Sequence, residues 1–450
     1  MIAISSPKDL SGTLTIPGSK SHTIRACVFG ALATGTSYIH NPLTSADCIA
    51  ALTAIKEIGA DYEMKDGLWI IHGAGTRLHL PENVIDVGNS GSVLYFLTPI
   101  CATMNGWSIV TGDESIRHRP VTHLLDALQQ MGCETIISRP NVNAPPIMVK
   151  GPAKSGIVVT DGILSQSITG LLIAASLLPG KTEFILRNPK ETPFLTMTEL
   201  WMRDLGIPIN ISKDFKRITV SGPMNYPAFE RIMPSDWESA AFPIVAALIT
   251  NSTITINKVD TSKSQGDAQI VEILKEMGAD IELIEDDPER QTGHLIVRGG
   301  NKSRLPNKGV LHGIRVNCSN YPDAVPALSV AACFAEGEMV IEDIGVCRHK
   351  ETDRIVIMAK ELSELGAKVT ETQDSLIIHG ANKAAPGFPL HGGTVHGYGD
   401  HRVAMALSVL GLGLNKGTVK VHDAECCDMS FPTFYTTMNE IGCEFKTRNK

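Results

Sequence analysis

Six times along the chain, a stretch with helical character ends in a hydrophobic residue and a glycine, and then runs into a short segment with strand character. The six endings are Ile58-Gly59, Met131-Gly132, Leu205-Gly206, Met277-Gly278, Leu365-Gly366 and Ile441-Gly442. Successive glycines are 73, 74, 72, 88 and 76 residues apart. This period is too long for a solenoid, whose repeats span about 20 to 50 residues. The pattern therefore predicts six copies of one helix–strand unit, grouped as two domains of three copies with a cleft between them.

A second landmark lies between those endings, where an apolar helix stops at glycine or asparagine and a β-branched strand follows. Glycine just past a helix supplies the left-handed residue that closes it, and a change of apolar period from 3.6 to 2 marks the strand. The expected strands contain Tyr38-Ile39, Ile109-Val110, Phe184-Ile185, Ile254-Thr255-Ile256, Val340-Ile341 and Val419-Lys420-Val421. Each unit therefore reads roughly as helix–strand–strand–helix–strand. Long apolar helical faces at 240–250, 324–334 and 403–412 predict helices buried inside the domains, with sheets packed around them.

The composition is typical of a globular enzyme. With 450 residues, 43% of them apolar and 20% charged, the chain can form two or three domains with their own cores. We expect no membrane span and no signal peptide, because no apolar run reaches roughly 18 residues and the amino terminus lacks a charged and long apolar region. Ten scattered cysteines without zinc spacing favour reduced thiols in a cytoplasmic protein without a metal site. The net charge of −8 argues against a nucleic-acid partner.

Against this negative balance, clusters of basic residues are informative, and the first two candidate loops precede apolar helices. In Pro17-Gly18-Ser19-Lys20-Ser21, with Arg25 one turn later, backbone N–H groups and a lysine could form an anion site. The same residues could equally form a capped helix with a solvated lysine. The loop Gly88-Asn89-Ser90-Gly91-Ser92 is, by itself, typical of an ordinary turn.

Three further clusters also stand at expected helix starts: Arg117-His118-Arg119-Pro120, the run 348–354, and Asp400-His401-Arg402. The run 348–354 has basic groups flanking two carboxylates, which could be ordinary pairing at a helix start. Repeats of one architecture point equivalent positions to one face, so we expect the cations of these loops to converge on the cleft between the domains. The converging residues are Lys20, Arg119, Lys350, Arg354 and Arg402. Such a set is typical of a site for a small polyanion that carries carboxylate and phosphate groups.

These motifs carry a family resemblance over nearly the whole chain. It rests on Pro17–Ser21 with Arg25, Gly88–Gly91, Arg119-Pro120, Ser165-Gln166, Asp323, Lys350–Arg354, Asp400–Arg402 and Phe431-Pro432. The chain resembles the enolpyruvyl transferases, most of all their 3-phosphoshikimate 1-carboxyvinyltransferase (EPSP synthase) branch. The sister branch that uses UDP-N-acetylglucosamine is less similar, because it typically has asparagine at the position of Ser21 and a cysteine in the loop where 113–115 stand.

The resemblance implies a fold as well. This is an α/β (α+β), two-domain inverse α/β barrel-like fold of six βαβαββ units, three in each domain, with an inter-domain cleft. It implies a discontinuous first domain made of residues 1–18 and 232–450, with residues 19–231 inserted as the second domain. We expect a monomer.

The implied reaction transfers the enolpyruvyl group of phosphoenolpyruvate to the 5-hydroxyl of shikimate 3-phosphate, releases phosphate and needs no cofactor. It requires cations for two anions, an acid for the methylene carbon and a base for the hydroxyl. The resemblance implies that Glu351 protonates the carbon, while Asp323 takes the acceptor's proton with help from Lys20. The residues implied to bind phosphoenolpyruvate are Lys20, Asn89, Gly91, Arg119, Gln166, Arg354 and Arg402. The residues implied to bind the acceptor are Lys20, Ser21, Arg25, Ser165, Gln166, Asp323 and Lys350.

Six positions depart from the family pattern: Tyr95, Leu164, Glu191, Phe194, Val346 and Met429. Four of them concern the acceptor. Leu164 and Glu191 replace serines, and Phe194 a tyrosine, near its phosphate, and Val346 replaces an asparagine near the acceptor. Tyr95 stands where the family has an arginine. One alternative is therefore an enolpyruvyl transferase with a different hydroxylated acceptor, such as an unphosphorylated cyclitol acid or a nucleotide. Another is a binding paralogue without turnover, although the set of Lys20, Asp323 and Glu351 argues against it.

Overall fold

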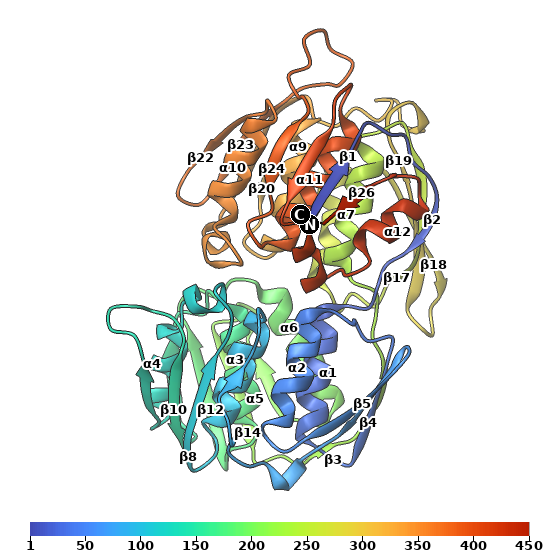
Figure 1. Ribbon diagram of the computed structural model, residues 1–450. Helices are drawn as coiled ribbons and strands as arrows, with labels where there is room; N and C mark the ends of the chain where they lie inside the picture. The colour runs from blue at the N-terminus through green and yellow to red at the C-terminus, as the bar shows by residue number, and fades with distance from the viewer. Residues whose placement is uncertain (450) are drawn as a thin grey trace. The chain divides into compact units, whose positions relative to one another are not determined.

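The computed structural model describes residues 1–449, and the chain divides into two compact units (Figure 1). The first unit contains Met1–Pro17 and Ser235–Lys450, and the second contains Gly18–Pro234. Among residues 1–449, none of the helices combines the length and the apolar character that crossing a bilayer requires.

Each unit is built from three four-stranded sheets that share one pattern: an edge strand lies parallel to its neighbour, and two further strands continue the sheet in antiparallel pairing. The sheets of the second unit, in spatial order, are β16 (Glu230–Ile232), β4 (Thr36–His40), β6 (Leu68–His72) and β5 (Asp61–Lys65); β7 (Ile85–Asp86), β8 (Gly106–Thr111), β10 (Ile147–Gly151) and β9 (Glu134–Ile137); and β11 (Ile157–Thr160), β12 (Gly180–Leu186), β14 (Arg217–Gly222) and β13 (Ile209–Ile211). The sheets of the first unit are β2 (Ser11–Thr15), β17 (Thr253–Asp260), β19 (Thr292–Arg298) and β18 (Asp280–Asp287); β20 (Arg315–Asn317), β21 (Gly337–Glu342), β23 (Leu376–Gly380) and β22 (Lys368–Glu371); and β24 (Gly393–His396), β25 (Val419–His422), β1 (Ile2–Ser5) and β26 (Lys446–Arg448).

Two helices accompany each sheet. Those of the second unit are α1 (Lys20–Leu32), α2 (Ala46–Lys56), α3 (Gly91–Cys101), α4 (Thr122–Gln130), α5 (Ser165–Ala175) and α6 (Thr192–Asp204). Those of the first unit are α7 (Trp237–Leu248), α8 (Gln269–Glu276), α9 (Val325–Cys333), α10 (Arg354–Glu364), α11 (His401–Gly413) and α12 (Phe434–Glu440). A short parallel pair, β3 (Ala33–Thr34) and β15 (Tyr226–Pro227), joins distant segments of the second unit.

Three repeats run in the order βαβαββ along the chain, as β7, α3, β8, α4, β9 and β10 illustrate. The other three contain the same elements but take one strand from a distant segment, so the expected repeat and fold class are confirmed. The coarser expectation of helix–strand–strand–helix–strand is wrong in one respect. The segment after β8 turns through a short 3₁₀ helix (Ile116–His118) into α4, and the antiparallel strand pair forms only after that second helix. Three sheets are completed by strands remote in the sequence, namely β1, β2 and β16.

The glycines that end the second helix of each repeat have the expected conformation. Gly59, Gly132, Gly206, Gly278, Gly366 and Gly442 all have φ between +76° and +102°. This left-handed region is costly for residues with a Cβ atom, which explains why the same residue type closes six separate helices.

The buried helices are also confirmed. Every residue of α7, α9 and α11 is buried, and these three helices pack on one another with sheets of the first unit around them (Figure 1). In the second unit, α1, α3 and α5 are buried except at their first turns, where Lys20, Ser21, Ser92 and Gln166 retain partial exposure. The polar residues of the sequence motifs thus lie at the N-terminal ends of apolar helices.

One of these helices contains a buried histidine. The Nδ1 atom of His22 accepts a hydrogen bond from the indole nitrogen of Trp201 at 3.0 Å. Burial, helped by the charges of Arg25 and Arg231, lowers the pKa of His22 to about 3. The imidazole is therefore neutral in the folded chain at every pH at which enzymes are usually assayed.

We predict that replacing His22 by glutamine destabilises the protein less at pH 5.0 than at pH 7.5. The unfolded chain protonates this histidine below about pH 6.5, whereas the folded chain keeps it neutral. The unfolded state then binds the extra proton, so the stability contributed by neutral His22 is complete above pH 6.5 and is lost as the pH falls. The difference in cost should be about 2 kcal/mol, at about 1.4 kcal/mol per pH unit. Urea unfolding of both proteins at both pH values measures it, and equal costs would contradict the prediction.

Candidate active site

Arg354 is the centre of the charged cluster in the first unit. It is the first residue of α10, and its side chain is fully buried. Its Nε atom contacts Asp400 Oδ2 at 2.7 Å, and its two terminal nitrogens contact Asp323 Oδ1 and Glu351 Oε2 at 2.6 Å each. Burial alone would lower the pKa of Arg354, but the three carboxylates outweigh burial and raise the pKa well above its usual value. Arg354 is therefore a permanent cation that holds three acids in fixed positions.

The elements that supply this cluster begin with capped helices. Asp400 is the N-cap of α11 and accepts hydrogen bonds from the backbone nitrogens of Arg402 and Val403. Asp353 caps α10 in the same way, which places Arg354 at the start of that helix. Asp323 lies in the 3₁₀ turn Pro322–Ala324 that leads into α9. Side-chain caps of this kind satisfy the unpaired N–H groups of a first helical turn, so each site residue has a local structural reason for its position.

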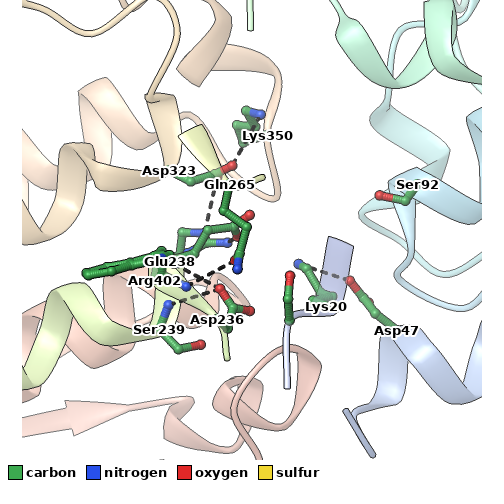
Figure 2. Close-up of polar contacts among 12 residues, drawn as sticks. Lys20, Asp47, Ser92, Asp236, Glu238, Ser239, Gln265, Asp323, Lys350 and Arg402 are labelled. Carbon is green, nitrogen blue, oxygen red and sulfur yellow. Dashed lines mark hydrogen bonds and ion pairs between the residues drawn. The ribbon is translucent and has the colours of Figure 1, made fainter. Parts of the chain in front are cut away.

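Asp323 faces three cations. Its Oδ1 atom lies 3.1 Å from Nε of Arg402, and its Oδ2 atom lies 3.9 Å from Nζ of Lys350 (Figure 2). The third cation is Arg354, whose contact with Asp323 is described above. Burial works to raise the pKa of Asp323, but Lys350 and Arg354 outweigh burial, and the net shift is downward. Asp323 is therefore ionised at neutral pH, the state in which a carboxylate can accept a proton from a hydroxyl group.

Three acidic residues around this cluster were missed by the sequence analysis. Glu238, in the first turn of α7, forms an ion pair with Arg402, and Asp236 caps the same helix (Figure 2). Asp267 is buried nearby; burial, then the charges of Asp323 and Asp236, raise the pKa of its carboxyl group well above the usual value. A signal was present, because each of these acids stands at a helix start equivalent to those that carry the recognised motifs.

In the second unit, Lys20 is the first residue of α1, and Ser19 caps the helix by accepting from the backbone nitrogen of His22. Nζ of Lys20 lies 3.3 Å from Oδ2 of Asp47, a buried residue in the first turn of α2 (Figure 2). The side chain of Lys20 is only 11% exposed. The alternative of a solvated lysine is therefore wrong. Gly18 is required here because a Cβ atom would lie 2.1 Å from the carbonyl oxygen of Asn41.

The starts of α3 and α5 bring three predicted residues together. A Cβ atom on Gly91 would lie 3.5 Å from Oε1 of Gln166 and 3.8 Å from the guanidinium of Arg119, so glycine leaves space between them. Nε2 of Gln166 donates to Oγ of Ser92 at 2.9 Å, and Arg119 is buried.

Two residues support the loops around this group. Nδ2 of Asn89 donates to Asp113 Oδ2 at 2.7 Å, which fixes the loop ahead of α3. Tyr95, which departs from the family pattern, donates from its hydroxyl group to the carbonyl oxygen of Pro120 at 2.8 Å. Tyr95 thus supports the loop that carries Arg119 instead of adding a cation.

Arg25 lies deep in the second unit. Its guanidinium donates to Oγ1 of Thr198 at 3.0 and 3.1 Å, to the carbonyl oxygen of Phe194 at 3.1 Å and to that of Ser21 at 3.0 Å. These acceptors are uncharged, and burial lowers the pKa of Arg25 to about 9. A buried cation held by neutral oxygens has the capacity to attract a small carboxylate.

The carboxylate of Glu191, a residue just ahead of α6, lies at the N-terminal end of α5. Its Oε2 atom accepts from the backbone nitrogen of Ser165 at 3.1 Å and from the Ser165 hydroxyl at 2.9 Å. Leu164 is the N-cap residue of α5, but its apolar side chain cannot accept a hydrogen bond from the first helical turn. Glu191 therefore acts as the cap from another part of the chain, and its buried carboxylate points toward Ser165. A phosphate about 4 Å away would be repelled by about 4 kcal/mol per pair of charges at an effective dielectric constant near 20.

The remaining departures lie in the first unit. Val346 is buried in the 3₁₀ helix Gly345–His349, just ahead of Lys350, and Met429 ends the 3₁₀ helix Ala424–Met429. The predicted site residues thus form two sets. Asp323, Lys350, Glu351, Arg354 and Arg402 are in contact within the first unit. In the second unit, Arg25 lies one turn inside α1, and the others lie at the starts of α1, α3 and α5 or in the loops before α3 and α4.

We predict that Arg354→Met destabilises the protein by about 3–5 kcal/mol at pH 7.5, because removal of a buried cation leaves its carboxylate partners uncompensated. Arg315→Met is the matched control, since Arg315 is 66% exposed and pairs with Glu342 at the surface. Surface pairs of this kind contribute about 0–1 kcal/mol. Urea unfolding followed by circular dichroism measures both variants. A cost for Arg354→Met no larger than that of the control would contradict the central role of Arg354.

Comparisons with known proteins agree with this geometry. Residues 4–438 match the family described as EPSP synthase (3-phosphoshikimate 1-carboxyvinyltransferase). The chain is 36% identical to a 3-phosphoshikimate 1-carboxyvinyltransferase of Acetivibrio thermocellus, over 97% of each sequence. Its structure is similar to that of EPSP synthase from Acinetobacter baumannii, with a TM-score of 0.81, 29% identity and full coverage of both chains. The enolpyruvyl transferase NikO from Streptomyces tendae shares the fold, with a TM-score of 0.78 and 16% identity over 99% and 98% of the two chains. The chain therefore belongs to the EPSP synthase (3-phosphoshikimate 1-carboxyvinyltransferase) family.

Proposed function

We propose that this protein is an enolpyruvyl transferase that moves the enolpyruvyl group of phosphoenolpyruvate to the 5-hydroxyl of shikimate 3-phosphate and releases inorganic phosphate. Family membership and the names of the relatives support the reaction type and the acceptor. The single observation that carries the proposal is the contact of Arg354 with Asp323 and Glu351, which holds a proton acceptor and a second carboxyl group on the two terminal nitrogens of one guanidinium.

The chemistry assigns a different task to each carboxyl group. In the addition step, the methylene carbon C3 of phosphoenolpyruvate gains a proton, and the acceptor oxygen bonds to C2 while its own proton leaves. In the elimination step, C3 loses a proton and the bond between C2 and the phosphate oxygen breaks. Asp323, ionised beside three cations, suits the removal of the hydroxyl proton. Glu351 is the group proposed to give the proton to C3 and to take it back.

The cations bind the anionic substrates in this proposal. Arg119, Arg402 and Lys20 would contact phosphoenolpyruvate, together with the loop of Asn89 and Gly91 and the amide of Gln166. Arg354 already binds three carboxylates, so we propose that it fixes the positions of these acids and also contacts the substrate. For the acceptor, Ser21 and Arg25 would bind the carboxylate, Gln166 would lie against the ring, and Ser165 and Lys350 would meet the substituent at position 3.

A second candidate function is the transfer of enolpyruvyl to a different hydroxylated acceptor, one without a phosphate. The observation that favours it is specific: the carboxylate of Glu191 holds both donors of Ser165. Both candidates use the same phosphoenolpyruvate chemistry and differ only in the group beside Ser165.

The cellular setting belongs to the proposal too. All ten cysteines are buried as thiols, which supports a reducing compartment such as the cytoplasm. That the protein acts as a monomer stays a prediction.

We predict that Glu351→Gln lowers kcat by about 10²- to 10⁴-fold, the usual contribution of a general acid or base. The amide keeps the size of the side chain and an oxygen that can accept from Arg354, so binding of phosphoenolpyruvate should change little. Phosphate release from phosphoenolpyruvate in the presence of shikimate 3-phosphate measures kcat. Glu364→Gln, an exposed position on the same helix, serves as the control and should retain full activity. A Glu351→Gln variant with undiminished turnover would overturn the assigned role.

A further inference from the structure

We propose that the first unit contains a second binding site, a cavity at the carboxyl ends of α7, α9 and α11 that takes a small carboxylate with an aromatic or aliphatic body. The cavity has a volume of about 450 Å³. Ligand pockets of proteins usually measure about 300 to 1,000 Å³. The inference does not rest on the proposed function, because the residues that line the cavity are separate from those assigned to enolpyruvyl transfer.

The cavity and the charged cluster around Arg354 lie at opposite ends of the same buried helices. The lining includes Leu248 and Ile249 at the end of α7, Phe334 at the end of α9 and Asn415 just past α11. The acids and arginines of the cluster stand instead at the N-terminal ends of these helices. Because α7 and α11 contain 12 and 13 residues, they are about 18 to 20 Å long. A ligand in the cavity therefore lies too far away to touch the cluster.

Part of the lining is apolar and belongs to the hydrophobic core. Leu248, Ile249, Leu311 and Phe334 are buried residues of that core, and all four line the cavity. The ring of Phe334 packs against the ring of Phe388, with 5.7 Å between the two centroids. The body of an aromatic or aliphatic ligand would cover this surface, and removal of apolar area from water is favourable.

The polar part of the lining carries positive charge. Among the described residues that line the cavity, Lys308 and Lys383 are basic and none is acidic. Lys383 is half-buried, and burial lowers the pKa of its amine, although the charge of Asp9 acts in the opposite direction. A bound carboxylate would compensate for this burial, because a nearby opposite charge stabilises the ammonium form. The lining therefore favours an anion over a neutral or cationic ligand.

The helix ends restrict the kind of anion and its orientation. The carboxyl end of a helix carries partial negative charge, and three such ends contribute to this lining. Their field opposes a doubly charged phosphate more strongly than a singly charged carboxylate. We therefore expect the carboxylate to lie beside the lysines and the apolar body to lie against the helix ends.

Hydrogen bonds hold the segments that carry the two lysines. Nδ2 of Asn415 donates to the carbonyl oxygen of Lys383 at 3.1 Å, which ties the loop after β23 to the end of α11. Nδ2 of Asn307 donates to the carbonyl oxygen of Val310 at 2.9 Å, which fixes the turn that carries Lys308. A preformed site of this kind loses little conformational freedom when a ligand binds.

The test measures binding of 4-fluorobenzoate to the full-length protein at pH 7.5 by ¹⁹F NMR, with the neutral 4-fluorobenzamide as a second probe. We expect a Kd for 4-fluorobenzoate of about 1 mM or below, which is reasonable for a ligand of about ten non-hydrogen atoms. The amide should bind at least about 5-fold more weakly, because it cannot pair with the lysines. Phosphoenolpyruvate should not displace the probe, since the cavity is remote from the charged cluster.

Two variants locate the probe. The double variant Lys308→Gln/Lys383→Gln removes the charges and should weaken binding of 4-fluorobenzoate at least about 5-fold. Ala384→Trp places a large side chain at an exposed position of the lining and should abolish binding. Lys302→Gln is the matched control, because Lys302 is an exposed lysine on the neighbouring 3₁₀ helix Gly300–Lys302 and lies outside the lining. The control should change Kd by less than about twofold.

Several results would overturn the inference. One is the absence of saturable binding by the wild-type protein up to about 10 mM, and another is unchanged affinity in either folded variant. Equally tight binding of the amide would mean that the lysines serve only the helix ends. Displacement by phosphoenolpyruvate would place the probe at the charged cluster instead. Should Ala384→Trp fail to fold, the double lysine variant and the two probes decide. Loss of enolpyruvyl transfer with intact binding of 4-fluorobenzoate in the cavity would overturn the proposed function alone.

Discussion

The contact of one buried guanidinium with three carboxylates organises the charged cluster of the first unit. Arg354 is held between Asp323, Glu351 and Asp400, and each acid comes from a different turn or helix start. A buried charge is stable only when it is paired, so the three acids and the arginine constrain one another's positions. The charges of Lys350 and Arg354 keep Asp323 ionised, and the Arg354 contacts hold it next to Glu351, as the proposed proton transfers require.

The repeated βαβαββ unit explains how such a cluster arises. In each unit of the fold, helices with almost entirely buried sides carry their polar residues at the N-terminal end. N-caps such as Asp400, Ser19 and Ser90 satisfy the first helical turn and direct the following residues. Repetition of one architecture therefore generates several equivalent positions for charged side chains at helix starts. The residue type at each position then determines its role in the site.

Much of the fold followed from local rules. Glycine closes six helices in the left-handed conformation, and the apolar helices at 240–250, 324–334 and 403–412 are buried as expected. The strand order within a repeat did not follow, because turn segments such as the one after β8 have no strong periodic signal. Nor could local patterns reveal that β1, β2 and β16 complete distant sheets, since strand pairing of that range depends on the whole chain.

The candidate site was predictable as a set of basic motifs, but the partners of those cations were not. Asp47 lies in the first turn of α2 and Glu238 in the first turn of α7. An acid at such a position is usually explained by its favourable interaction with the helix dipole alone. The side chain of Glu191 points toward Ser165 because α5 packs against α6. The sequence alone could not predict this orientation of the side chain.

The most direct test of the central claim follows the carbon skeleton of the substrate. Phosphoenolpyruvate labelled with ¹³C at C2 would be incubated with the protein and with shikimate 3-phosphate or shikimate, and observed by ¹³C and ³¹P NMR. The account predicts an enol ether carbon that has lost its coupling to phosphorus, together with an equal amount of inorganic phosphate. Conversion of the label to pyruvate, or no change with either acceptor, would contradict enolpyruvyl transfer.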